Sequence, residues 1–144
     1  MDICKCLNAC CEKGKVGTSV LMWPATPNTT KSEDVMAAEI FNQVFSGQLL
    51  HPLVFGDYPP VLRYLVDKRD TERGDGKVSL PPFTEEEKKM LSEGVTDFIA
   101  LNLYSGVKAS YNGSATSQSQ SILLGPVMAD MPFVQVTNVN DFSV

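Results

Sequence analysis

Two polar side chains at the end of an apolar segment have the types and the spacing to act together on a ligand. Asn102 supplies an amide and Tyr104 a phenol. Side chains two positions apart point to the same face of a β-strand, so both groups would project together from the carboxyl end of that strand. Open parallel sheets and barrels bind ligands at this end. The alternative is that both are buried polar groups with hydrogen bonds made inside the protein.

The acidic side chains Glu85, Glu86 and Glu87 form the densest group of carboxylates in the chain. With Thr84 they have the form of a capping box, in which the threonine and the third glutamate satisfy each other's backbone amides. The pattern predicts a helix that runs through about Leu91, with its acids at the positive end of the helix dipole. The three glutamates are therefore interpreted as structural.

The four cysteines, Cys4, Cys6, Cys10 and Cys11, all fall within the first eleven residues. Zinc sites commonly use pairs spaced C-x2-C or wider, and the only histidine, His51, is distant in sequence. Structural or unpaired thiols are favoured over a metal site. Metal binding by these cysteines is the distant third hypothesis for the function of the chain, after the two given at the end of this section. No cofactor is predicted.

Two apolar segments are predicted to be neighbouring strands. Residues 15–23 form a short run that Pro24 ends, and residues 97–103 form a longer one. A long helical segment separates them, so the pattern predicts a βαβ unit with parallel strands. From Phe98 to Leu103 the apolar side chains are interrupted only once, which predicts a strand buried on both faces.

The helical segment is divided by turn signals. A capping box at residues 30–33 is predicted to start a helix that Gly47 weakens and Pro52 ends. Asp57 is predicted to cap the next short helix, and the charged residues 67–77 to form a surface loop. The first helix carries an apolar stripe suited to packing on a sheet: Ala37, Ala38, Phe41, Val44, Phe45 and Leu49.

The composition, 43% hydrophobic and 20% charged over 144 residues, is that of one globular domain. A net charge of −5 without a basic stripe argues against a surface for nucleic acid or an anionic membrane. No apolar run approaches the length of a membrane span, and the first residues do not match a signal peptide, so the compartment stays open. Two N-glycosylation sequons, at Asn28 and Asn112, matter only in a secreted protein.

Several blocks of the chain resemble glycoside hydrolase family 1, which includes β-glucosidases, lactase-type enzymes, myrosinases and klotho-type relatives. The blocks occur in the order and spacing of that family. They are Ala37-Ala38-Glu39, Phe45 with Gly47, His51-Pro52-Leu53, Gly56-Asp57-Tyr58-Pro59, Leu80-Pro81-Pro82-Phe83-Thr84-Glu85-Glu86-Glu87 and Asp97-Phe98-Ile99-Ala100-Leu101-Asn102-Leu103-Tyr104-Ser105.

The resemblance covers about residues 15–105 and implies an α/β fold, a fragment of a (β/α)8 barrel with its fifth and sixth strands. Residues 1–144 are then a partial barrel segment, in which residues 106–144 are a polar, divergent tail with no predicted element. In the family the acid/base glutamate lies in an Asn-Glu-Pro motif and the nucleophile in a Glu-Asn-Gly motif. This chain contains neither motif, so the resemblance implies part of a retaining β-glycosidase that lacks both catalytic residues.

The resemblance carries over the pair Asn102 and Tyr104. In the family the tyrosine hydroxyl hydrogen-bonds the nucleophile and the asparagine helps to order the donor-sugar subsite, so a β-glycoside is the implied partner of the complete enzyme. Trp23 stands one place early for an aromatic on the aglycone side, and core packing is the preferred interpretation. The competing hypothesis is a non-catalytic protein, either a truncated pseudo-enzyme or an interaction module.

Overall fold

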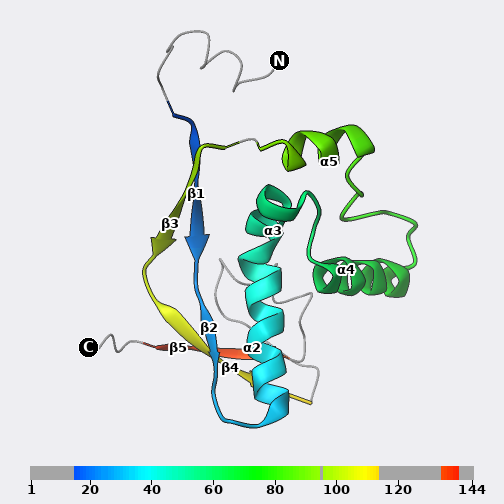
Figure 1. Cartoon of the computed structure of the whole chain (residues 1–144). Helices are drawn as coiled ribbons and strands as arrows, with labels where there is room; N and C mark the ends of the chain where they lie inside the picture. Colours follow the sequence, from blue (N-terminus) through cyan, green and yellow to red (C-terminus); the bar gives the residue numbers. More distant parts are fainter. Residues whose placement is uncertain (1–14, 95, 114–133, 140–144) are drawn as a thin grey trace.

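The structure is a computed structural model that describes residues 15–94, 96–113 and 134–139 (Figure 1). The cysteines lie outside these residues. In the described part no helix is long and apolar enough to cross a membrane. The elements, in chain order, are β1 (Gly17–Met22), β2 (Ala25–Pro27), α2 (Ser32–Phe45), α3 (Gly47–Phe55), α4 (Pro60–Arg73), α5 (Glu85–Ser92), β3 (Phe98–Leu103), β4 (Gly106–Tyr111) and β5 (Val134–Val139).

The predicted parallel pair of strands is confirmed. β1 and β3 pair in parallel from Gly17 opposite Phe98 to Met22 opposite Leu103. A reciprocal pair of hydrogen bonds fixes the start of this register, since the Asp97 N–H donates to the Val16 carbonyl and the Val16 N–H donates to Asp97 Oδ2, each at 2.7 Å. The acidic residue before β3 therefore aligns the two strands.

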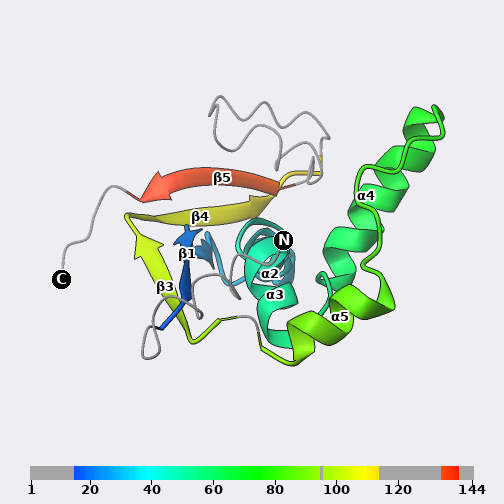
Figure 2. The same ribbon diagram turned by 90° about the horizontal axis from the view of Figure 1, so that it is seen from above.

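A second sheet continues from the first. β2 pairs in parallel with β4, and β4 pairs antiparallel with β5. The helix α2 packs on this sheet, and Figure 2 shows the strands on one side of α2 and α3, with α4 and α5 on the other. The core lies between these layers and consists of Ala25, Ala37, Ala38, Phe41, Val44, Leu62, Leu65, Val66, Val107, Ala109 and Val134.

The helix boundaries correct two sequence predictions. The predicted capping box at residues 30–33 does not form, because α2 begins at Ser32 and its N-cap, Lys31, makes no side-chain cap. Pro52 does not end a helix but lies inside α3, which instead ends at Gly56 with φ 76°. Left-handed backbone of this kind favours glycine, so Gly56 supplies the stop that had been assigned to the proline.

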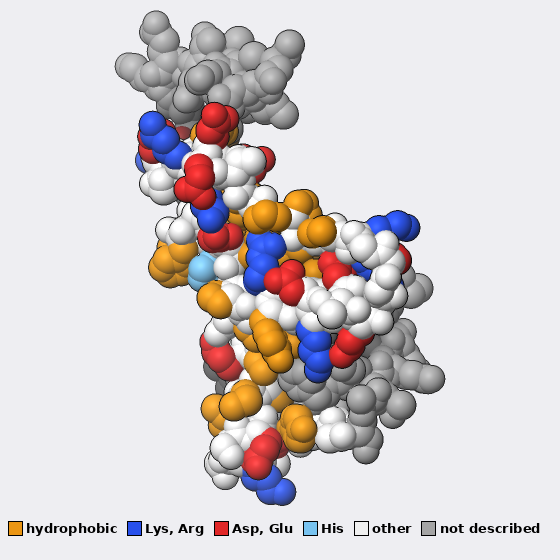
Figure 3. All heavy atoms as spheres, turned by 90° about the vertical axis from the view of Figure 1, so that its right-hand side faces the viewer, with side chains coloured by type: hydrophobic (Ala, Val, Ile, Leu, Met, Phe, Trp, Pro, Cys, Tyr) orange, Lys and Arg blue, Asp and Glu red, His pale blue; other side chains and the backbone are white. Residues whose placement is uncertain are grey.

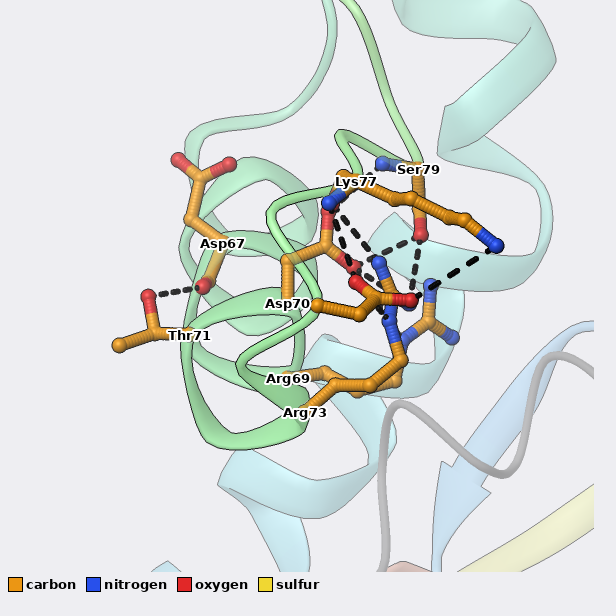
Figure 4. Close-up of polar contacts among 8 residues, drawn as sticks. Asp67, Arg69, Asp70, Thr71, Arg73, Lys77 and Ser79 are labelled. Carbon is orange, nitrogen blue, oxygen red and sulfur yellow. Dashed lines mark hydrogen bonds and ion pairs between the residues drawn. The ribbon is translucent and has the colours of Figure 1, made fainter.

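The predicted surface loop at residues 67–77 is wrong in its first half, because α4 continues to Arg73. Charged pairs at helical spacing support these turns, as Arg73 Nη1 lies 3.0 Å from Asp70 Oδ1. Figure 4 shows Ser79 folded back onto the same carboxylate, with its N–H and hydroxyl donating to Asp70 at 2.6 and 2.7 Å. Asp57 caps no helix, because the N-cap of α4 is Pro59.

The strand β3 differs most from its prediction. It was expected to be buried on both faces, yet Phe98 is 50%, Leu101 48% and Leu103 58% exposed. In the described part of the chain β1 is the only strand that pairs with β3. The apolar sequence of β3 is thus suited to burial, but the described part of the chain does not bury this strand. Figure 3, which views the side of α4 and α5, also shows exposed hydrophobic side chains among charges of both signs.

Candidate functional site

Asn102 and Tyr104 lie where β1 and β3 end side by side. Asn102 is in register with Leu21 of β1, and Tyr104 follows β3 directly. Both are exposed, and Tyr104 is 71% exposed. Neither side chain makes a hydrogen bond to another described residue. Internal satisfaction of these two polar groups, the alternative interpretation of the sequence, therefore does not occur within this part of the chain.

Hydrogen-bonded strands hold Tyr104 from both directions along the chain. Just beyond it the ladder resumes, with the Val107 N–H donating to the Pro24 carbonyl at 3.0 Å. Gly106 permits this close approach, because a Cβ at that position would lie 3.2 Å from the Pro24 oxygen. Tyr104 thus occupies a short joint between two paired segments, which restricts where its backbone lies.

Sequence reasoning missed the strand after this joint, although a signal was present. In the sequence of β4 the apolar Val107 and Ala109 alternate with the polar Lys108 and Ser110. In the structure the side chains of Val107 and Ala109 are buried, whereas those of Lys108 and Ser110 are not. Alternation of this kind is the pattern of a strand with one buried face. The tail after Ser105 therefore begins with a regular element that supports the joint.

Trp23, in the connection between β1 and β2, is partly buried and packs against the core, in line with the preferred interpretation of the sequence. Its ring stacks on Phe45 with centroids 5.8 Å apart, and Phe45 stacks in turn on Phe41 at 5.4 Å. The indole Nε1 is buried and has no hydrogen-bond partner among the described residues. Packing on α2, rather than contact with a ligand, accounts for the ring position in this structure.

A hollow of about 350 Å³ lies beside the end of β1. Ser46 is buried, and its hydroxyl makes no hydrogen bond within the described residues. Neither Asn102 nor Tyr104 lines this hollow, so it is separate from the predicted pair. Its lining is Met22, Pro24, Asn42, Gln43, Ser46, Gly47, Leu50, His51, Val54 and Phe55.

The capping box predicted at the start of α5 is confirmed. Glu87 Oε2 accepts a hydrogen bond from the Thr84 N–H at 2.8 Å, and the Glu87 N–H donates to Thr84 Oγ1 at 3.2 Å. The bond from the Thr84 backbone, followed by that from its side chain, lowers the pKa of Glu87. In the described residues no cluster of three His, Cys, Asp or Glu is placed to hold a metal.

The loop before α4 is joined to α5 by an ion pair. Lys88 Nζ lies 3.1 Å from Asp57 Oδ2, and Asp57 Oδ1 accepts a hydrogen bond from the Tyr58 N–H at 2.8 Å. The Tyr58 bond is the largest of the effects that lower the pKa of Asp57, and contact with Asp57 raises the pKa of Lys88. Asp57 therefore fixes a turn and docks the helix that precedes β3.

A buried carboxylate that the sequence did not single out connects the second sheet to α2. Asp34 is 7% exposed; its Oδ2 accepts a hydrogen bond from Thr29 Oγ1 at 2.6 Å and its Oδ1 one from the Tyr111 N–H at 2.9 Å. These two bonds, that from Thr29 first, lower the pKa of Asp34. The end of β4 is thereby anchored to the first turn of α2.

Curated relatives of the chain are glycoside hydrolases. It is 38% identical to "Myrosinase 1" of Brevicoryne brassicae over 95 residues, which are 65% of this chain and 20% of that protein. It is 31% identical to "Beta-glucosidase 11" of Arabidopsis thaliana over 130 residues, which are 90% of this chain and 23% of that protein. The chain thus spans less than a quarter of the length of either relative.

Solved structures of glycoside hydrolases match the fold of this chain. An aphid myrosinase matches 88% of this chain with a TM-score of 0.73 at 29% identity, and the match covers 26% of that enzyme. A rice beta-glucosidase matches 93% with a TM-score of 0.69 at 23% identity, covering 25% of that enzyme. The fold is accordingly that of a fragment of a (β/α)8 barrel. Since the sequence model of glycosyl hydrolase family 1 also matches residues 2–132, the chain belongs to that family.

Proposed function

We propose that this chain forms part of the donor-sugar subsite of a retaining β-glycosidase, with Asn102 and Tyr104 as the residues that support the site. The observation that carries the proposal is the parallel register of β1 and β3, in which Asn102 lies opposite Leu21 and Tyr104 follows the paired strands. Barrel enzymes bind substrate at the carboxyl ends of their strands. Exposed amide and phenol groups at this end are available to a ligand.

The two groups have distinct roles in this proposal. The phenol of Tyr104 donates a hydrogen bond to the nucleophilic carboxylate, which favours the ionised form and orients its attacking oxygen. The amide of Asn102 both donates and accepts, so it suits the hydroxyl groups of a sugar. Neither group breaks the glycosidic bond, and both act as positioning residues.

Bond cleavage needs two carboxyl groups about 5 to 5.5 Å apart, one to protonate the leaving oxygen and one to attack the anomeric carbon. The chain has neither of the motifs that carry them in the family. Glu87 is engaged with Thr84 at the start of α5, and Glu85 lies 3.6 Å from Lys88 in the same helix. The isolated chain is therefore expected to hydrolyse no β-glucoside or β-galactoside above background.

A chimeric enzyme tests the proposal. Residues 15–111 would replace the corresponding segment of a complete family enzyme that retains its own two glutamates. The chimera is expected to release the phenol from an aryl β-glucoside, and the Asn102→Ala variant to raise KM or lower kcat. A folded chimera in which Asn102→Ala and Tyr104→Phe both leave kcat and KM unchanged would contradict the assignment. Turnover by the isolated chain that persists in a Glu85→Gln, Glu86→Gln, Glu87→Gln variant would also contradict it.

A further inference from the structure

The two N-glycosylation sequons occupy different environments in the fold. Asn28-Thr29-Thr30 follows β2 directly and forms the connection to α2, whereas Asn112 follows β4. We propose that Asn28 is a site of N-glycosylation when the chain passes through the secretory pathway, and that Asn112 is not. The proposal does not depend on the glycosidase assignment.

The Asn28 sequon lies on the surface on a backbone that is already fixed. Asn28, Thr29 and Thr30 are all exposed. The Asn28 N–H donates to the Ala109 carbonyl at 2.8 Å, so the main chain is anchored to β4. The Asn28 side-chain amide makes no hydrogen bond to a described residue, and a large glycan at this position displaces no contact of that kind.

The two hydroxyl groups of this sequon differ, and the one that the sequon requires makes no hydrogen bond to a described residue. The Thr29 hydroxyl, in the middle position, donates to the buried Asp34 carboxylate at 2.6 Å. The Thr30 hydroxyl, which completes the sequon, makes no hydrogen bond within the described residues. The hydroxyl that the acceptor pattern requires is thus exposed, while its neighbour holds the turn in place.

The second sequon begins at a residue that is less exposed than Asn28. Asn112 is half-buried and takes part in a contact of its own. The residue before it, Tyr111, is fixed through its N–H to Asp34 Oδ1 at 2.9 Å. A glycan on the Asn112 amide would have to fit at a half-buried position at the end of β4, which disfavours a folded, glycosylated product.

The reaction balances with a lipid-linked sugar donor. The Asn28 amide nitrogen forms a bond to C1 of the first N-acetylhexosamine of an oligosaccharide carried on an isoprenoid diphosphate. The bond between C1 and the diphosphate oxygen breaks, and the isoprenoid diphosphate leaves with the electron pair. The amide gives up one proton to a base of the transferring enzyme. No oxidant or reductant is needed.

The test is expression of the full 144-residue chain behind a heterologous secretion signal in eukaryotic cells. Its mobility on a denaturing gel is compared before and after digestion with an amidase that removes N-glycans. Asn28→Gln and Thr30→Ala each destroy the first sequon by a different residue, and Asn112→Gln is the matched control. Since a denaturing gel reports the covalent glycan, the reading does not require the variants to be equally stable.

We expect one glycan-sized shift that the amidase removes. It should be lost in Asn28→Gln and in Thr30→Ala and kept in Asn112→Gln. The proposal is overturned by the absence of any shift in the parent chain, by a second shift that Asn112→Gln removes, or by a shift that survives in Asn28→Gln. Peptide mass spectrometry with the amidase in heavy-oxygen water assigns the residue directly, since deglycosylation converts the modified asparagine to a labelled aspartate.

Discussion

Asn42 on α2 bonds to both backbone polar groups of Ala25 on β2. Its Oδ1 accepts a hydrogen bond from the Ala25 N–H at 2.8 Å, and its Nδ2 donates to the Ala25 carbonyl at 3.0 Å. Ala25 also stands in register with Val107 of β4. The side-chain amide thus satisfies the backbone groups that a further strand would otherwise pair, and it closes part of the edge of β2.

Replacement of Asn42 by alanine is expected to destabilise the chain. It leaves the partly buried N–H and C=O of Ala25 without their partners, and an unsatisfied group of this kind costs about 1–3 kcal/mol. The free energy of unfolding, measured from urea transitions, should fall by that amount. Gln43→Ala is the control, because it removes only an exposed bond to Glu39 and should change stability by less than about 0.5 kcal/mol. Equal losses in both variants would count against the role of Asn42.

The stability of the α4 terminus is expected to decrease in acid. Hydrogen bonds from the backbone and hydroxyl of Ser79, with the charge of Arg73 nearby, lower the pKa of Asp70. A carboxyl group with a lowered folded-state pKa stabilises the fold above its unfolded pKa of about 3.9, and this contribution is lost as the pH falls through the folded value. Protease cleavage near Gly74 should therefore accelerate as the pH is lowered from about 5 towards 3, when followed with an acid-active protease.

Two variants separate this effect from general acid sensitivity. Asp70→Asn should already be cleaved faster at pH 7 and should show a smaller increase towards acid, because the titrating group is gone. Asp67→Asn should behave as the parent chain, since Figure 4 shows the Asp67 carboxylate pointing away from the cluster around Asp70. Identical pH profiles for the parent and Asp70→Asn would refute the linkage.

The exposed strand β3 is expected to make the isolated chain self-associate. Leu101 and Leu103 are about half exposed on a strand with one described neighbour, and exposed apolar strands promote edge-to-edge pairing. Changing both to lysine should raise the concentration at which light scattering first detects oligomers. Val78→Lys, at a position 65% exposed in a loop, is the control and should have little effect. Onset at the same concentration in all three proteins would exclude β3 as the cause.

The Tyr104→Phe change, made in the chimeric enzyme, tests the role of the phenol. It keeps the ring and removes one donor to the nucleophilic carboxylate, and a hydrogen bond to a charged group is worth about 1.5–3 kcal/mol. The rate should fall roughly tenfold to a hundredfold. The acidic limb of the pH–rate profile should move to higher pH, because the carboxylate becomes easier to protonate.

A purely structural tyrosine gives a different result. It would lower the unfolding midpoint and leave the acidic limb where it was. Tyr64→Phe, on α4 and 65% exposed, controls for loss of a hydroxyl far from the strand ends and should change neither quantity. A pH profile that does not move in Tyr104→Phe would remove this residue from the site.

Sequence patterns were sufficient to predict one strand pair and one helix start. The parallel pair β1 and β3 followed from two apolar runs and a helical connection, and the Thr84–Glu87 capping box formed as predicted, because its bonds span only three residues. The capping box predicted at residues 30–33 spans the same short distance but did not form, because α2 begins at Ser32 with Lys31 as its N-cap. Pro52 ended no helix, because α3 follows α2 after the single residue Ser46 and continues through the proline to its stop at Gly56.

Only the tertiary structure revealed the side-chain contacts between distant segments. The bond between Asp34 and the Tyr111 N–H joins residues 77 positions apart, and no periodicity in the sequence specifies it. The exposure of β3 could not be predicted from the sequence either. An apolar strand sequence indicates that the strand is suited to burial, whereas its actual burial depends on which neighbouring elements are present. Sequence motifs thus determined the family, and they single out Asn102 and Tyr104 as the pair proposed for the site. The fold decided that both side chains are exposed, with Asn102 near the end of β3 and Tyr104 in the joint before β4, because long-range hydrogen bonds, rather than local propensity, fix that joint.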